Sequence, residues 1–228
     1  MDRRTMLGTL AAGAAAVALK AEDKDGKPAM AAGHPNADYA PRPFDFGNGL
    51  SGLSKDLLAE HVTLYKGYVG RTNALLKDLL AAEKEGKSGA MIQELRRRLG
   101  FEFSGMRVHE WYFEALSNAG GKPTEHHPLH EAIAETWGSW DAWWAAFKAT
   151  ATMPGIGWAA LVKDPMTGRL MNAWFQDHEN AIPVGATPIL VVDVWEHAYV
   201  KDYGATGRGK YVDAVKGLIH WPAVERRF

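Results

Sequence analysis

The sequence contains no cysteine among its 228 residues. This absence excludes disulfide bonds, thiolate nucleophiles, zinc–thiolate sites and iron–sulfur clusters. Any metal ion that the chain binds must therefore be held by nitrogen and oxygen atoms.

The sequence also lacks an excess of charge of either sign, since its formal net charge is -1. Obligatory nucleic-acid binding normally requires a basic surface, so we expect no nucleic-acid partner. Long apolar runs are missing as well. The longest one, at residues 7–19, is too short to cross a bilayer as a helix, so we expect no membrane span in the mature protein.

The first residues have the pattern of an export signal. Arg3 and Arg4 precede the short apolar run, and small residues suited to cleavage follow it. Paired arginines at this place indicate a twin-arginine signal over residues 1–21, with a Sec signal or a lipid-side anchor as alternatives. The mature protein would then be periplasmic or extracellular. Residues 22–48, rich in Lys, Asp, Gly, Pro and Ala, are predicted to form a linker.

Two long amphipathic helices are predicted next. Ser54 is a suitable N-cap, and apolar residues recur every three or four positions from Leu57 to Leu79. A polar, glycine-containing turn at residues 83–89 separates this stripe from a second one, from Ile92 to Leu116. The pattern predicts an antiparallel helical hairpin as one domain, residues 49–120.

The remaining residues, 121–228, change to a mixed pattern and are predicted to form a second, α+β domain. Short apolar or aromatic runs flank a turn at residues 164–168, which is a β-hairpin signal. The fold class is therefore α+β, with a small three-stranded antiparallel sheet flanked by helices. Helices are expected at residues 129–135, 140–150 and, with an interruption at 204–209, 195–228; strands are expected at 157–162, 170–175 and 187–192.

Four side chains are candidate metal ligands. Asp193 and His197 follow the third strand four positions apart, so one helical turn would aim both the same way. His61 and His109 are the only histidines in the apolar stripes of the two long helices. A single histidine in such a stripe is more often a hydrogen-bonded core residue, but three imidazoles and one carboxylate together suit manganese, iron or zinc.

Other basic groups have simpler interpretations. His126, His127 and His130 precede a predicted helix and form a solvated helix start more readily than a second metal site. His178 and His220 are predicted to be structural. The run Arg96, Arg97 and Arg98 is predicted to be a solvated helix face that could assist the capture of anions.

The segment D-V-W-E-H-A-Y at residues 193–199 resembles the signature of iron/manganese superoxide dismutases. The match extends to residues 53–61, which resemble the start of the family's first helix, and to residues 107–113, which resemble its second ligand segment. In total the resemblance covers residues 50–228.

The resemblance implies an antioxidant enzyme that disproportionates superoxide at one manganese or iron ion per chain and acts as a homodimer. The ligands would be His61, His109, Asp193 and His197. The alternatives are a metal-binding homologue with little or no turnover, and a zinc hydrolase that uses the same ligands.

The resemblance also implies roles for surrounding residues. Tyr68 would be the gateway tyrosine, and Gln176 would hydrogen-bond the metal-bound solvent. Because Gly105 stands at the family's other position for this glutamine, the arrangement looks like the manganese type. Tyr112, Trp158 and Trp195 would line the pocket. Glu196 would reach across the dimer interface to the partner's His197.

The sequence departs from the family pattern on the first helix. The family usually has a histidine pair where this chain has Leu64 and Tyr65, and a tyrosine where it has Val200. The interval between His61 and Tyr68 is also one residue shorter than usual. A gap-free alignment from Tyr68 would make Glu60 the ligand, but His61 fits the apolar stripe, so we predict His61.

Overall fold

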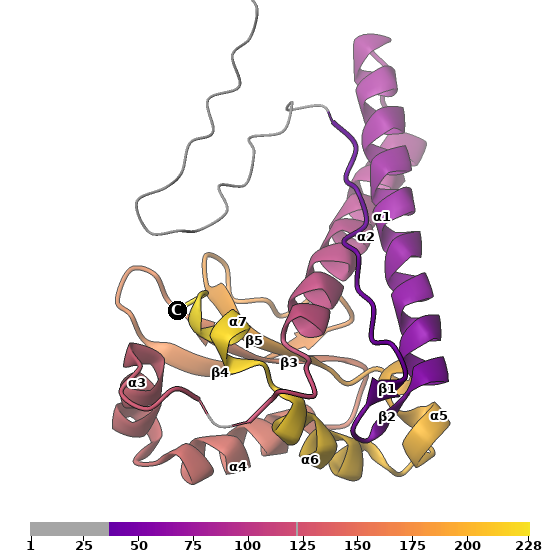
Figure 1. The fold of residues 1–228 in the computed structure, drawn as a ribbon. Helices are drawn as coiled ribbons and strands as arrows, with labels where there is room; N and C mark the ends of the chain where they lie inside the picture. The colour runs from indigo at the N-terminus through magenta and orange to yellow at the C-terminus, as the bar shows by residue number, and fades with distance from the viewer. Residues whose placement is uncertain (1–36, 122) are drawn as a thin grey trace, which may run out of the picture. The chain divides into compact units, whose positions relative to one another are not determined.

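The computed structural model describes residues 37–121 and 123–228, so the predicted export signal and most of the predicted linker lie outside the described residues. The predicted hairpin is confirmed. It consists of α1 (Lys55–Lys84) and α2 (Ala90–Glu114), which lie side by side (Figure 1). Ser54 caps α1 as expected, because its hydroxyl accepts a hydrogen bond from the Leu57 N–H at 3.2 Å.

The predicted three-stranded sheet is also confirmed. Its order is β4 (Leu170–Gln176), β3 (Gly157–Lys163) and β5 (Thr187–Asp193), and both pairings are antiparallel. Strand β3 is central and almost wholly buried. In the register of β3 with β5, Trp158 lies opposite Asp193, so the end of β5 brings a carboxylate beside a large aromatic side chain.

Helices surround the sheet and connect it to the hairpin. Helix α2 contacts β5, and α4 contacts β3 and β4. The indole of Trp143 in α4 donates a hydrogen bond to Asn172 in β4 at 3.0 Å. The helices outside the hairpin are α3 (Pro128–Trp137), α4 (Trp140–Ala151), the 3₁₀ turn η1 (Glu196–Ala198), α5 (Val200–Tyr203), α6 (Arg208–Leu218) and α7 (Trp221–Glu225).

Residues 39–47, here called the strap, precede the hairpin and run alongside it without regular secondary structure (Figure 1). They lead into a small antiparallel ribbon of β1 (Gly49–Leu50) and β2 (Leu53–Ser54). Although this stretch was predicted to be linker, it contacts the helices through hydrogen bonds and aromatic rings.

Residues 39–228 form one compact unit, and the predicted division between residues 120 and 121 stays a prediction. Among the described residues, no helix combines the length and apolar character that a membrane crossing requires.

Candidate metal centre

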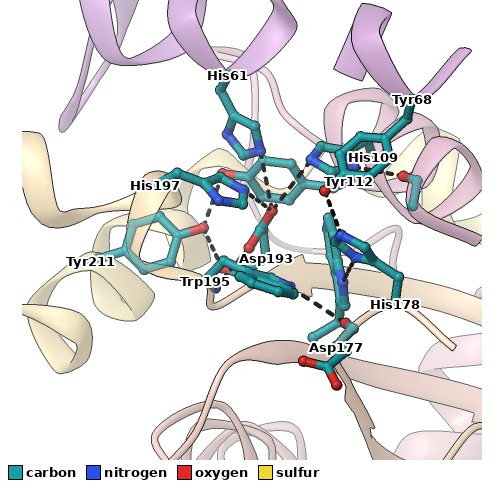
Figure 2. Close-up of polar contacts among 12 residues, drawn as sticks. His61, Tyr68, His109, Tyr112, Asp177, His178, Asp193, Trp195, His197 and Tyr211 are labelled. Carbon is teal, nitrogen blue, oxygen red and sulfur yellow. Dashed lines mark hydrogen bonds and ion pairs between the residues drawn. The ribbon is translucent and has the colours of Figure 1, made fainter. Parts of the chain in front are cut away.

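The four predicted ligands meet at one place. Donor atoms of His61, His109, Asp193 and His197 all lie within 4.8 Å of one another. Figure 2 shows the three imidazoles directed toward the Asp193 carboxylate, one from each of α1, α2 and η1. Among the described residues this is the only such group of three or more histidine, aspartate and glutamate side chains.

Asp193 and His197 converge by a different route from the predicted helical turn. Asp193 is the last residue of β5, and His197 lies in the 3₁₀ turn that follows. Their Oδ2 and Nε2 atoms are nevertheless 3.2 Å apart. The backbone N–H of Trp195 donates to the other carboxylate oxygen at 2.8 Å, so the loop itself orients Asp193.

His109 is oriented by the helix that carries it. Its Nδ1 lies 2.6 Å from the carbonyl oxygen of Gly105, which can only accept, so Nδ1 holds the proton. The lone pair of the neutral ring is then on Nε2. That atom is buried and has no hydrogen-bond partner. An unpaired buried acceptor that faces a carboxylate and two further imidazoles fits a bound cation.

His61, not Glu60, belongs to the cluster. The His61 Nε2 lies 3.1 Å from Asp193 Oδ2, whereas the exposed Glu60 forms an ion pair with Lys201 at 2.5 Å. The Nδ1 of His61 is buried without a hydrogen-bond partner, whereas the Nδ1 of His109 has one. Helix α1 is continuous from Lys55 to Lys84. It therefore accommodates the interval between His61 and Tyr68, which is one residue shorter than is usual in the family.

The electrostatics of the cluster favour neutral imidazoles on the two long helices beside an ionised carboxylate. Burial lowers the pKa of His61 and lowers the pKa of His109 still further. Burial by itself would raise the pKa of Asp193, but the charge of His197 and hydrogen bonds from His197 and His61 outweigh it and hold that pKa below its ordinary value. Metal binding needs this combination of an ionised carboxylate and unprotonated rings.

Tyr68 lies beside the cluster, as predicted, but Gln176, which the resemblance assigned to the metal-bound solvent, does not lie next to it. The expected residue, Gln176, has an exposed side chain at the end of β4. The Tyr68 hydroxyl lies instead 2.7 Å from Nε2 of His178, which is fully buried. Asp177 makes this possible, because its backbone has a φ of 53° and turns the chain inward one residue later.

The tautomer of His178 follows from its other neighbour. The indole N–H of Trp158, which can only donate, lies 3.0 Å from Nδ1 of His178. Nδ1 is therefore the acceptor, and the neutral ring carries its proton on Nε2 and donates it to the Tyr68 oxygen. Burial keeps this ring neutral by lowering the pKa of His178 to about 4, and it raises the pKa of Tyr68 to about 12.

Gly105 makes room for this pair. A Cβ at this position would lie 2.7 Å from the Tyr68 ring and 3.2 Å from His178 Cδ2. Any larger residue would therefore displace the tyrosine. The glycine that the sequence singled out as one of two alternative positions thus has a steric role next to the centre.

The predicted wall residues surround the cluster. Trp158 and Tyr112 are fully buried, and Trp195 is half-buried and stacks near His197 with ring centroids 5.8 Å apart. Tyr211 was missed. Its hydroxyl donates to the backbone carbonyl of Asp193 at 2.7 Å and lies 2.9 Å from the Tyr112 hydroxyl. No sequence signal distinguishes it from an ordinary core tyrosine.

An ion cluster with a buried carboxylate and two exposed arginines lies outside Tyr68. The carboxylate of Glu102 is 1% exposed and accepts hydrogen bonds from Arg71 and Arg98, each at 2.8 Å. The Arg71 guanidinium lies 4.6 Å from the centroid of the Tyr68 ring. Of the three arginines that were predicted to be solvated, Arg98 is thus partly engaged near the centre.

The opposite side of the centre opens to solvent. A pocket of about 460 Å³ reaches His61 and His197. Leu64 and Val200, two of the three positions at which the sequence departs from the family pattern, both line it. The other lining residues are Glu60, Glu196 and Lys201.

The histidines near residue 127 remain outside any ligand group. His127 is the N-cap of α3, and its Nδ1 accepts a hydrogen bond from the Leu129 N–H at 3.1 Å. This supports the interpretation of a helix start.

Comparison with known proteins agrees with the geometry. A family model described as iron/manganese superoxide dismutases, C-terminal domain, matches residues 125–227. Superoxide dismutase [Fe] of Cupriavidus metallidurans is 36% identical over 182 residues, which cover 78% of this chain and 90% of the relative.

Two further relatives carry manganese in their names. Superoxide dismutase [Mn] 1 of Haloferax volcanii is 34% identical, covering 84% of this chain and 96% of the relative. Superoxide dismutase [Mn/Fe] of Propionibacterium freudenreichii subsp. shermanii is also 34% identical, covering 82% and 93%. With its ligand cluster, its fold and relatives matched over nearly their whole length, the chain belongs to the iron/manganese superoxide dismutase family.

Proposed function

We propose that the chain is a superoxide dismutase with one iron or manganese ion held by His61, His109, Asp193 and His197. The observation that carries the proposal is the buried four-residue cluster, in which His109 presents an unpaired Nε2 to an ionised carboxylate. The reaction converts two superoxide anions and two protons into one dioxygen and one hydrogen peroxide. The ion, when bound, supplies the change between the +3 and +2 oxidation states that passes an electron from one superoxide to the other.

The ligands set the charge and rigidity of the site. The ionised carboxylate of Asp193 favours the more highly charged ion, because attraction to an anion grows with cation charge. Asp193 is held by the Trp195 N–H on its side chain and by Tyr211 on its carbonyl, and His109 is held by Gly105. Such outer hydrogen bonds orient ligands and tune their basicity.

Tyr68 and His178 together can supply the protons that the reaction consumes. Since His178 donates to the tyrosine oxygen, the tyrosine's own hydrogen is free to point toward the centre. Tyr68 can therefore donate to an anion at the centre, and His178 stabilises the phenolic oxygen as that proton leaves. This replaces the role that the sequence assigned to Gln176.

A matched pair of variants tests the proposal. His61→Ala should abolish metal retention and dismutase turnover, whereas the exposed neighbour substitution Glu60→Ala should leave both close to the wild type. Elemental analysis and a superoxide-removal assay on the same preparations provide the two measurements. A wild-type protein that retains iron or manganese without turnover would instead favour the non-catalytic homologue.

A homodimer is part of the proposal. Glu196 is exposed beside the pocket that reaches His197, and in the second subunit it would meet the partner's His197. Carboxylate contacts to ligand histidines are a frequent means of orienting them. Glu196→Ala should shift the protein toward monomers in sedimentation measurements, and an unchanged assembly state would argue against this contact.

Export is proposed from the sequence of residues 1–21. The twin-arginine route would carry a chain that has already folded around its ion. The N-terminal sequence of the secreted or periplasmic protein would locate the cleavage site. Replacing both arginines by lysine, Arg3→Lys with Arg4→Lys, should retain the precursor in the cytoplasm, and normal export of that variant would leave the Sec signal as the better interpretation.

A further inference from the structure

We infer that the strap, residues 39–47, is a positioning element for the ligand His61, acting through Phe113. This inference rests on the proposed metal centre. It starts from the difference between the two helix-borne imidazoles. His109 is held by a hydrogen bond to Gly105, whereas Nδ1 of His61 is buried with no partner.

The Nε2 of His61 lies 3.1 Å from Asp193, but no hydrogen bond holds the opposite edge of the ring, so the packing of neighbouring rings sets its orientation there. The nearest aromatic ring contributed by α2 is Phe113, whose centroid lies 4.8 Å from that of His61 in an edge-on arrangement. Phe113 is 2% exposed. Tyr112 lies somewhat farther away, at 5.4 Å. Close-packed rings hold one another because neither can move without opening a void.

The strap supplies the other side of Phe113. The rings of Phe44 and Phe46 lie 5.2 and 5.7 Å from it. Phe44 also contacts Tyr65, at 5.6 Å. Phe113 is therefore enclosed between the strap and the ligand, and a displacement of the strap would be transmitted to His61 through one ring.

Polar contacts hold the strap at this place. The backbone N–H of Arg42 donates to the Tyr65 hydroxyl at 2.9 Å, and that hydroxyl donates to buried Glu110 at 3.0 Å. Farther along, Tyr39 and Asn73 exchange two hydrogen bonds, each of 2.9 Å. Tyr65 stands where the family has part of its histidine pair, so the departure in sequence coincides with the attachment point of the strap.

The experiment measures metal release from the full-length, metal-loaded chain into excess chelator. The test variant is Phe44→Leu with Phe46→Leu, which keeps the strap apolar but removes both rings. Its release rate should rise about 10-fold, the lower end of what losing an outer partner of a ligand costs. The control is Phe228→Leu, a half-buried phenylalanine that no ring contact links to His61.

Thermal unfolding of the metal-free proteins separates positioning from general loss of stability. The inference holds if the test variant releases metal faster than Phe228→Leu at matched metal-free stability, and it is overturned if the two release at the same rate. Should the double variant fail to fold, the single variants decide the question by the same comparison. Release does not depend on turnover, so a wild type without dismutase activity would contradict only the proposed function.

Discussion

The two sides of the metal centre are built in different ways. On one side, a hydrogen bond joins His109 to the Gly105 carbonyl, and two further hydrogen bonds link Tyr68, His178 and Trp158. On the side of His61 and His197, the neighbours are packed rings and an open pocket, whose lining includes the aliphatic Leu64 and Val200 and three charged side chains. The polar side has the geometry for moving protons, whereas the open side has room for a small anion or a second subunit.

This contrast explains where the chain departs from its family. Leu64 and Val200 both lie on the open side, so the loss of the usual polar residues leaves the proton-handling side intact. We expect substitutions on the polar side to change turnover. We expect those on the open side to act, if at all, on metal retention or assembly.

The largest effect is expected where the two sides meet. Asp193→Ala removes the carboxylate that lies 3.1 Å from His61 and 3.2 Å from His197. Three imidazoles remain without the anion that balances the ion, so metal content should fall by at least about 10-fold. Elemental analysis of the purified variant checks this, and a normal metal content would refute the ligand assignment.

The polar side is tested by exchanging the two candidate residues after β4. His178→Gln should lower turnover by about 10- to 100-fold with the metal retained, because the donor to Tyr68 is altered. Gln176→Ala should leave turnover unchanged, since that side chain is exposed. If Gln176→Ala lowered turnover and His178→Gln did not, Gln176 would have the role that the sequence predicts, and the assignment of that role to His178 would be wrong.

The same histidine should make stability depend on pH. Burial lowers the pKa of His178 from 6.5 to about 4, so the folded protein binds fewer protons than the unfolded chain between these values. This contribution is complete above pH 6.5 and is lost as the pH falls toward 4. For metal-free protein it amounts to about 3 kcal/mol at most. Urea unfolding of wild type and His178→Gln from pH 7 to 4 should show a shallower slope for the variant.

Gly105 offers a steric test of the polar side. Gly105→Ala places a methyl group against the Tyr68 ring, and overpacking of this kind costs about 1–3 kcal/mol. Turnover should fall while the metal stays bound. Gly100→Ala on the same helix is the control, because nothing lies within 4 Å of its new methyl group. It should raise stability by up to about 1 kcal/mol through helix propensity alone.

The smallest effect is expected on the open side. Leu64→Ala shortens a half-buried side chain that lines the pocket without altering a ligand. Stability should fall by about 1 kcal/mol, with metal content and turnover unchanged. Thermal unfolding and a turnover assay test this, and a large loss of metal would show that packing at Leu64 also positions His61.

Much of the fold could be predicted because its signals are local. Short apolar or aromatic runs located all three strands of the sheet to within one residue, and the apolar stripes located the hairpin. The ligands were found because the signature at residues 193–199 is compact and each long helix stripe offers one histidine.

What was missed depends on geometry that sequence spacing does not specify. The inward position of His178 results from a left-handed Asp177, and Tyr211 reaches Asp193 only through tertiary packing. Residues 39–47 have the composition of a linker, yet a few aromatic side chains and two backbone N–H groups attach them to the hairpin. Composition alone does not distinguish a free segment from a bound one.

The distance along the chain between His61 and Asp193, 132 positions, bears on how the protein selects its ion. During synthesis the helices of the hairpin emerge first and offer two imidazoles, while the carboxylate and the third imidazole are still to be translated. The complete set of ligands exists only when translation is nearly finished and the sheet has formed. The ion is therefore captured from the supply of the compartment in which folding ends. For a chain exported in the folded state that compartment is the cytoplasm, and for one exported unfolded it lies beyond the membrane.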